Sequence, residues 1–237
     1  DIVNEISFPE LLKRIDKVGD DFWLRYITSH PKDISDDLIY AYKDFKNVVN
    51  HLHLPVQSGS NKILKFMNRN YTIDDYKKKI DALRKIREGI YLTTDIIVGF
   101  PGETETDFNE TIKAIDDIKF DFEFVFKYSD RKKTKASLFP EKVSKQEIET
   151  RHQILLNKIL NLSFESNKKF LNKKVKVLVE KESPKNEKYL SGRTEENKVV
   201  IIKGDKNLIG TFVNVRINAV KSYTLWGEII NDNEFKI

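Results

Sequence analysis

The feature that most constrains the fold is a regular alternation of short apolar runs with amphipathic stretches over residues 1–171. Strand-like runs cover residues 23–28, 48–56, 92–100 and 122–129. Between and after them, residues 35–45, 61–67, 74–88 and 104–117 have the pattern of helices. This order, repeated at intervals of roughly 25 to 45 residues, predicts an α/β fold built from parallel βαβ units.

Several helix starts are marked by capping residues. Ser35 precedes the first predicted helix, and Thr104 with Asp107 has the spacing of a capping box. Ser144 with Glu147 has the same spacing and opens a long amphipathic stretch that we expect to end near Leu171.

The pattern of the sequence changes after this stretch from helical to strand-like. The runs VKVLVE, NKVVIIKG, GTFVNVRINAV and TLWGEII are rich in β-branched residues and are separated by turn clusters. We therefore predict two domains, residues 1–171 and 172–237, the second being a small all-β barrel of about five antiparallel strands. Such barrels often bind oligonucleotides. Residues 172–237 hold 13 Lys and Arg against 9 Asp and Glu, which concentrates most of the net charge of +5 in the smaller domain.

Composition excludes several classes of protein. The chain has no cysteine, which rules out disulfides, thiol nucleophiles and iron–sulfur or Cys-based zinc sites made by this chain alone. No apolar run approaches the roughly 20 residues that cross a bilayer, and we expect no signal peptide at the start.

Polar or glycine-rich residues follow each of the four predicted strands, where parallel α/β folds gather their functional groups. They are Ser29 and His30, Gln57 to Ser60, Gly99 to Glu103, and Tyr128 to Arg131. Any single one of these segments could be an ordinary turn, but four in succession indicate a ligand site at the carboxyl edge of the sheet.

Three of these segments have specific alternatives. In QSGSNKIL the free N–H groups of a helix start could bind a carboxylate or phosphate, or Ser58 or Ser60 could simply cap the helix. Gly99 and Gly102 let the backbone lie against a flat ligand, or they could form a tight loop without function. In YSDRKKT an aromatic ring and a guanidinium are suited to stacking and anion contacts, or the segment could be an ordinary basic surface loop.

His51 and His53 alternate along a predicted strand and so share one face. A strand-borne pair can bind a metal, but the only later histidine is His152, inside the predicted long helix. We expect one of the pair to be a packed wall residue and the other to face a ligand. A metal-dependent barrel hydrolase that uses His51 and His53 remains an alternative hypothesis.

In the smaller domain a Ser-Gly-Arg segment is predicted to lie between strands, and Lys203, Lys206, Arg216 and Lys221 lie near turns. The aromatic residues interleaved with them are Tyr189, Phe212, Tyr223 and Trp226. Together they suit RNA binding through phosphate contacts and stacking, although the rings could equally fill the barrel core.

Taken in order along the chain, these sequence motifs resemble those of a known family. HLHLPVQSGS followed by ILKFMNR, then TTDIIVGFPGET, YSDR and LSGRTEEN are similar to the methylthiotransferases of the radical S-adenosylmethionine superfamily. TSHPKD at residues 28–33 and HLHLPVQSGS look most like the MiaB-type branch, which modifies isopentenylated adenosine beside the tRNA anticodon. The resemblance implies a partial (β/α) barrel with about its last four strands, followed by a TRAM domain that holds RNA.

The resemblance also implies cofactors that this chain cannot hold alone. Family members use S-adenosylmethionine and two [4Fe–4S] clusters, one of them bound by a Cys-x3-Cys-x2-Cys loop, and this chain has no cysteine. We therefore expect a C-terminal fragment that is inactive by itself and contains no catalytic residue. The implied partner is the tRNA anticodon stem-loop and the implied location is the cytoplasm. Truncated barrel edges would favour association. Alternatives are the ribosomal-protein and threonylcarbamoyladenosine branches, or a non-catalytic RNA-binding protein.

Carried over residue by residue, the resemblance places the cofactor against Ser29, His53, Gln57, Ser58, Gly59, Asp95, Gly99, Phe100 and Tyr128. Substrate or RNA contacts fall to Arg131 and, in the barrel, to Arg193, Lys203, Arg216 and Lys221. The family usually continues YSDR with Pro-Gly-Thr, whereas this chain has Lys132, Lys133 and Thr134, which weakens the assignment of that loop.

Overall fold

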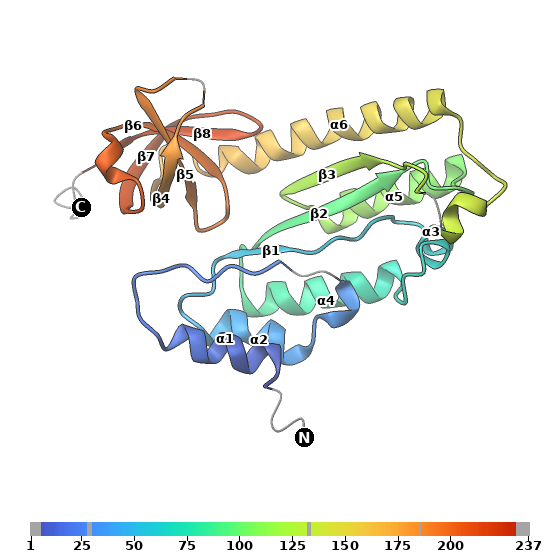
Figure 1. Cartoon of the computed structure of the whole chain (residues 1–237), viewed down its shortest axis with the longest axis horizontal. Coiled ribbons are helices and arrows are strands. Elements are labelled where there is room, and N and C mark those ends of the chain that lie inside the picture. Colours follow the sequence, from blue (N-terminus) through green and yellow to red (C-terminus); the bar gives the residue numbers. More distant parts are fainter. Residues whose placement is uncertain (1–5, 28–29, 132–133, 185, 231–237) are drawn as a thin grey trace. The chain divides into compact units, whose positions relative to one another are not determined.

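The computed structural model describes residues 6–27, 30–131, 134–184 and 186–230 (Figure 1). The chain divides into two compact units, residues 1–159 and 160–237. This division falls inside the long helix α6 (Lys145–Lys168), whereas the predicted boundary after residue 171 falls between α6 and the first strand of the barrel. The expected domain limits stay a prediction.

The first unit is built on a parallel sheet in the order β1-β2-β3. Its strands are β1 (His51–His53), β2 (Tyr91–Val98) and β3 (Phe122–Lys127), and both neighbouring pairs are parallel, as the alternation predicted. The predicted strand at 23–28 is reduced to two isolated parallel bridges, Leu24 with Val48 and Ile27 with His53. The backbone of this segment thus meets its neighbour only at single residues among those described.

Several helices begin at the capping residues predicted from the sequence, among them Ser144, which accepts from the Glu147 N–H at the start of α6. Ser35 accepts a hydrogen bond from the Leu38 N–H at the start of α2 (Asp36–Asp44). Capping boxes open α4 (Ile73–Ile86) and α5 (Glu105–Ile118), and α3 (Asn61–Phe66) follows the QSGS segment. Helix α1 (Phe8–Asp16) was not predicted, and short 3₁₀ turns lie at Pro31–Asp33, Lys135–Leu138 and Lys206–Leu208.

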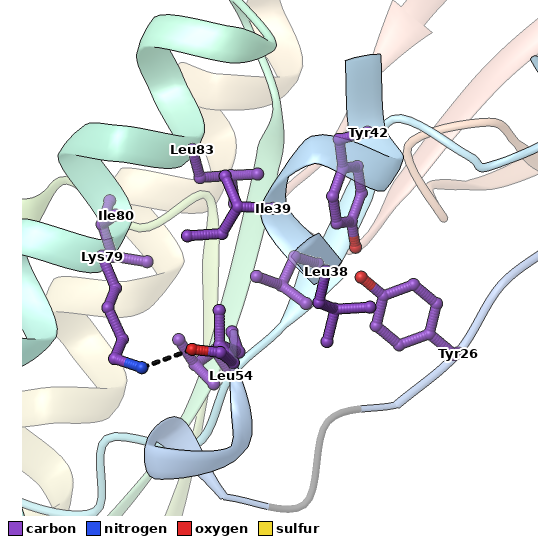
Figure 2. Close-up of a pocket in the computed structure, with 10 residues that line it drawn as sticks. Tyr26, Leu38, Ile39, Tyr42, Leu54, Lys79, Ile80 and Leu83 are labelled. Atoms are coloured by element: carbon purple, nitrogen blue, oxygen red, sulfur yellow. Dashed lines mark hydrogen bonds between the residues drawn. The ribbon is translucent and has the colours of Figure 1, made fainter. Parts of the chain in front are cut away.

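One face of the sheet packs against helices α2 and α4. Leu52 and Leu54 of the β1 segment meet Leu38 of α2 and Ile80 of α4, as Figure 2 shows for Leu54 and its helical neighbours. The space between these side chains is too small for a water molecule. The ammonium of Lys79 donates to the Ile34 carbonyl at its margin. This region is therefore packed core rather than a ligand cavity.

The second unit contains a closed barrel with strand order β4-β5-β6-β8-β7. The strands are β4 (Lys174–Glu182), β5 (Tyr189–Thr194), β6 (Val199–Lys203), β7 (Phe212–Val220) and β8 (Thr224–Ile229). Its interior is filled by Val177, Val179, Leu190, Val200, Ile202, Val215, Ile217 and Leu225.

The barrel corrects two details of the sequence prediction. First, β6 and β8 pair in parallel, whereas all strands were expected to be antiparallel. A closed ring of five strands cannot alternate direction at every step, so one neighbouring pair must be parallel. Second, the Ser-Gly-Arg segment lies within β5 instead of between strands. A Cβ on Gly192 would lie 2.4 Å from the Leu178 carbonyl oxygen, so this glycine permits a close backbone approach rather than a turn.

Among the described residues, no helix is long and apolar enough to cross a membrane.

Candidate functional site

His51 and His53 meet at one hydroxyl group on the sheet face opposite the helices. Thr93 Oγ1 lies 3.0 Å from His51 Nε2 and 2.9 Å from His53 Nδ1. His51 is buried, while His53 is partly exposed and its Nε2 lies 3.5 Å from Asp95 Oδ1. The described residues contain no group of three or more His, Cys, Asp or Glu that could hold a metal ion. The geometry fits one packed histidine and one histidine that faces outward beside a carboxylate.

The same face is open to solvent along β3. Phe124 and Phe126 alternate with helix-facing residues and remain 48% and 50% exposed. The Phe124 ring lies 6.1 Å from the ring of His53, and register pairs Phe124 with Asp95. The face thus places apolar rings beside the His53 and Asp95 side chains.

Gln57 lies at the carboxyl end of the first strand in a left-handed backbone conformation with φ 69°. Its N–H donates to the Asp95 carbonyl at 2.8 Å, and its carbonyl accepts from the Ile97 N–H at 2.9 Å. These two bonds hold the Gln57 backbone against β2, opposite Ile96.

The polar groups that follow Gln57 point into the protein toward α5. The Gly59 N–H donates to Thr111 Oγ1 at 3.0 Å, and the Ser58 hydroxyl lies 3.3 Å from the same oxygen. The Ser60 hydroxyl donates to Asp107 Oδ1 at 2.7 Å and makes no capping bond to α3. The cofactor role of Ser58 and Gly59 stays a prediction, but in this structure their polar groups bind a helix.

The Gly99–Glu103 loop is held closed by α6. Gly99 has φ 75°, and its N–H donates to Glu103 Oε2 at 2.7 Å. The same carboxylate lies 2.7 Å from Arg151 Nη1, and the two side chains are only 1% and 5% exposed. Burial raises the pKa of Glu103, although the bonds from Gly99 and Arg151 oppose that shift. A Cβ on Gly99 would lie 2.3 Å from Ile148, so α6 occupies the space beside this glycine.

Two aromatic rings lie in contact where β2 and β3 end. The rings of Phe100 and Tyr128 lie 5.1 Å apart, edge to face. The Tyr128 hydroxyl donates to Asp130 Oδ1 at 2.8 Å, and Lys142 pairs with the same carboxylate at 2.7 Å. Burial and the adjacent Asp130 raise the pKa of Tyr128 to about 12. Tyr128 is therefore a neutral hydrogen-bonding phenol near neutral pH.

Of four further residues at the predicted carboxyl edge of the sheet, the structure describes only Arg131. Arg131 is exposed, and its carbonyl accepts from the Thr134 N–H at 3.2 Å. Ser29 lies outside the described residues, as do Lys132 and Lys133.

The four basic residues of the barrel that were predicted to contact RNA have different surroundings. Arg193 Nε pairs with Glu180 at 3.2 Å, and its Nη1 donates to Asn197 Oδ1 at 2.9 Å, so this guanidinium is held within the barrel. Arg216 lies on β7, in register with Lys174 and Glu228. Lys203 and Lys221 are exposed, and the Lys221 ammonium lies 5.4 Å above the Trp226 ring.

Sequence reasoning missed the side chains that organise the loops. Thr93 could have been found, because it alternates with Asp95 on the face that bears the histidines. Arg151 and Thr111 lie within helices and are 48 and 52 residues away from the loop residues that they bind. No local pattern marks them.

Comparisons with known proteins agree with this architecture. Residues 5–115 match the model of the radical SAM superfamily, and residues 168–230 match that of the TRAM domain. Residues 5–115 therefore belong to the radical SAM superfamily, and residues 168–230 form a TRAM domain, as predicted.

Within that superfamily the chain is homologous to tRNA methylthiotransferases. It is 48% identical, over 97% of its length, to the tRNA-2-methylthio-N(6)-dimethylallyladenosine synthase of Acetivibrio thermocellus, of which it covers 48%. The proteins of the same name from Thermoanaerobacter sp. and Fusobacterium nucleatum are 44% and 43% identical over 97% of the chain, which covers 49% and 53% of them. The chain spans about half the length of these curated relatives.

Proposed function

We propose that this chain forms part of a tRNA methylthiotransferase that acts on N6-dimethylallyladenosine (the isopentenyladenosine of the sequence prediction) next to the anticodon. The observation that carries this proposal is the 48% identity along 97% of the chain to a synthase of that name. The open parallel sheet followed by a basic barrel supports it, because the two units suit a cofactor and a nucleic acid respectively. We place this activity in the cytoplasm.

S-adenosylmethionine is proposed to bind at the carboxyl edge of the sheet. Gln57, Asp95, Gly99, Phe100 and Tyr128 lie at the ends or on the open face of neighbouring strands there. Asp95 is 26% exposed and can accept hydrogen bonds from ribose hydroxyls, while the ring pair of Phe100 and Tyr128 suits contact with adenine. The bound cofactor supplies the radical and methyl chemistry, and these residues orient it.

Iron–sulfur clusters do not fit this chain by itself. It has no cysteine, so it offers no thiolate ligand. In the intact enzyme we assign the cluster ligands to segments outside these 237 residues. The chain alone is accordingly proposed to be inactive.

The substrate assignment is tested by deleting the gene and measuring modified nucleosides in bulk tRNA by mass spectrometry. We expect the 2-methylthio nucleoside to disappear, N6-dimethylallyladenosine to accumulate, and the intact gene to restore the wild-type pattern. An unchanged nucleoside profile would contradict the assignment. A loss confined to a threonylcarbamoyladenosine derivative or to a modified ribosomal protein would instead identify a sister branch.

A second candidate function concerns this chain alone. Its lack of cysteine and its basic barrel favour RNA binding without catalysis. Binding of a tRNA anticodon stem-loop by the purified chain, measured at several salt concentrations, tests this candidate directly. Undetectable binding at low salt would exclude it.

A further inference from the structure

Two aromatic rings lie together on the outside of the barrel. Tyr189 on β5 and Trp226 on β8 alternate with Leu190 and Leu225, which are fully buried in the interior. The two rings are 5.7 Å apart, edge to face, and both remain partly exposed. The barrel core is filled without these two rings. Core packing therefore does not explain why they lie at this surface.

Two lysines flank these rings. Lys203 is exposed and lies opposite Tyr189 in the β5–β6 register. The Lys221 ammonium lies 5.4 Å above the Trp226 ring. We call Tyr189, Lys203, Lys221 and Trp226 the aromatic–lysine patch.

The turn that carries Lys221 is fixed by α6. Asn167 Nδ2 donates to the carbonyls of Lys221 and Ser222 at 2.6 and 3.1 Å, and the Ser163 hydroxyl donates to the Ser222 carbonyl at 2.5 Å. Asn167 is fully buried. The backbone beneath Lys221 is therefore set in advance, while its ammonium remains at the surface.

We propose that the aromatic–lysine patch binds an unpaired RNA nucleobase together with its neighbouring phosphates. A base has a π-face that stacks on an exposed indole, and such stacking is stronger than a solvent-exposed cation–π contact. A base arriving on the face of Trp226 that Lys221 covers displaces the ammonium, which is then free to pair with a phosphate. This inference rests on the proposed tRNA-binding function and gives it a specific surface and a requirement for unpaired bases.

Other basic parts of the barrel fit this role less well. The Arg193 guanidinium is already bound by Glu180 and Asn197. The aromatic–lysine patch combines paired rings, two exposed lysines and a fixed turn.

The test uses the full 237-residue chain and two fluorescently labelled RNAs of equal length. One is a stem-loop with an unpaired seven-nucleotide loop, and the other is a fully paired duplex. Binding is followed by fluorescence anisotropy across a salt series. We expect Trp226→Ala to weaken stem-loop binding roughly tenfold and duplex binding less than about twofold. Lys221→Ala should weaken both RNAs and reduce the salt dependence.

Matched controls separate stacking from general damage. Tyr40→Ala removes an exposed ring from α2, and Lys77→Ala removes a lysine of α4 that pairs with Asp117 at 2.7 Å; both should bind the stem-loop within about twofold of wild type. If Trp226→Ala does not fold, as judged by circular dichroism, Trp226→Leu keeps the apolar bulk and makes the same comparison. Trp226→Phe should retain most of the affinity.

Two results would overturn the inference. If the wild-type chain binds the stem-loop but Trp226→Ala and Trp226→Leu do not weaken it, RNA binding stands and the patch is not its site. If Trp226→Ala weakened binding of the stem-loop and of the duplex equally, the patch would not recognise unpaired bases. Failure of the wild-type chain to bind either RNA would reject the proposed RNA binding itself.

Discussion

Arg151 on α6 binds Glu103, 48 residues earlier in the chain, through a buried contact of 2.7 Å between Nη1 and Oε2. The same carboxylate oxygen accepts the Gly99 N–H, and Arg151 Nη1 also donates to the Glu103 carbonyl at 3.0 Å. One guanidinium therefore fixes the loop that follows β2. The helix that covers the loop also determines its shape.

Removing this guanidinium should destabilise the first unit strongly. Arg151→Met leaves the Glu103 carboxylate buried without its partner, which costs about 3–5 kcal/mol. Chemical denaturation of the purified chain measures this loss. As a control, Lys158→Met breaks the more exposed pair with Asp116 and should cost less than about 1 kcal/mol. Equal losses for the two variants would contradict the structural role given to Arg151.

Glu123 should make stability depend on pH. Its side chain is 2% exposed, neither carboxyl oxygen has a hydrogen-bond partner among the described residues, and burial raises its pKa from 4.5 to about 8. The folded chain keeps a proton that the unfolded chain releases. The free energy of unfolding should therefore fall by several kcal/mol between about pH 4.5 and pH 8 and level off above that, since one pKa unit corresponds to about 1.4 kcal/mol.

Substitution isolates the contribution of Glu123 to this profile. Glu123→Gln should flatten it and make the chain more stable than wild type above pH 8. Glu149→Gln changes an exposed carboxyl paired with Lys127 and should leave the fall between pH 4.5 and pH 8 in place. Denaturation at a series of pH values provides the measurement, and a Glu123→Gln profile that matches wild type would refute the prediction.

Gly59 should not tolerate even a methyl group. A Cβ there would lie 2.5 Å from Thr111 Cα and 2.6 Å from the Glu110 carbonyl oxygen, and both are backbone atoms of α5. Gly59→Ala should cost roughly 1–3 kcal/mol because the loop or the helix must shift. A Cβ at Gly19 meets nothing within 4 Å, so Gly19→Ala should change stability by less than about 0.5 kcal/mol in the same thermal unfolding experiment. Identical midpoints for both variants would contradict the close approach.

Asn167 should couple α6 to the stability of the barrel. Asn167→Ala removes the donor to the Lys221 and Ser222 carbonyls and should cost about 1–3 kcal/mol. Hydrogen exchange of β7 and β8 amides reports this loss locally. Asn157→Ala, on an exposed part of the same helix, should leave those exchange rates unchanged. Unaltered exchange in Asn167→Ala would show that the turn is held by other contacts.

Local signals explain why much of the fold could be predicted. Thr104 and Asp107 sit within one turn of each other, and the capping box that they form depends on nothing distant. The alternation of Leu52 and Leu54 with His51 and His53 likewise fixed which side chains face the helices. The predicted strands 92–100 and 122–129 end two residues beyond the ends of β2 and β3, whereas the predicted strand 48–56 is reduced to His51–His53.

Non-local contacts explain what the sequence could not reveal. Gly192 was taken for a turn residue because its reason for being glycine is the Leu178 carbonyl on another strand. Ser58 and Gly59 were expected to face a cofactor, and only the folded chain brings Thr111 to their polar groups. Candidate positions could be named from the sequence, but not the partners that already satisfy them.

The order of strands in the barrel has a consequence for its synthesis. β8 lies between β6 and β7 in the ring, although it is the last of the five along the chain. A nascent chain that has emerged only as far as residue 223 therefore presents two bare strand edges, which are sites where other chains can pair. The barrel can close only when Thr224–Ile229 has left the ribosome, so a pause in translation just before that point would expose the chain to aggregation.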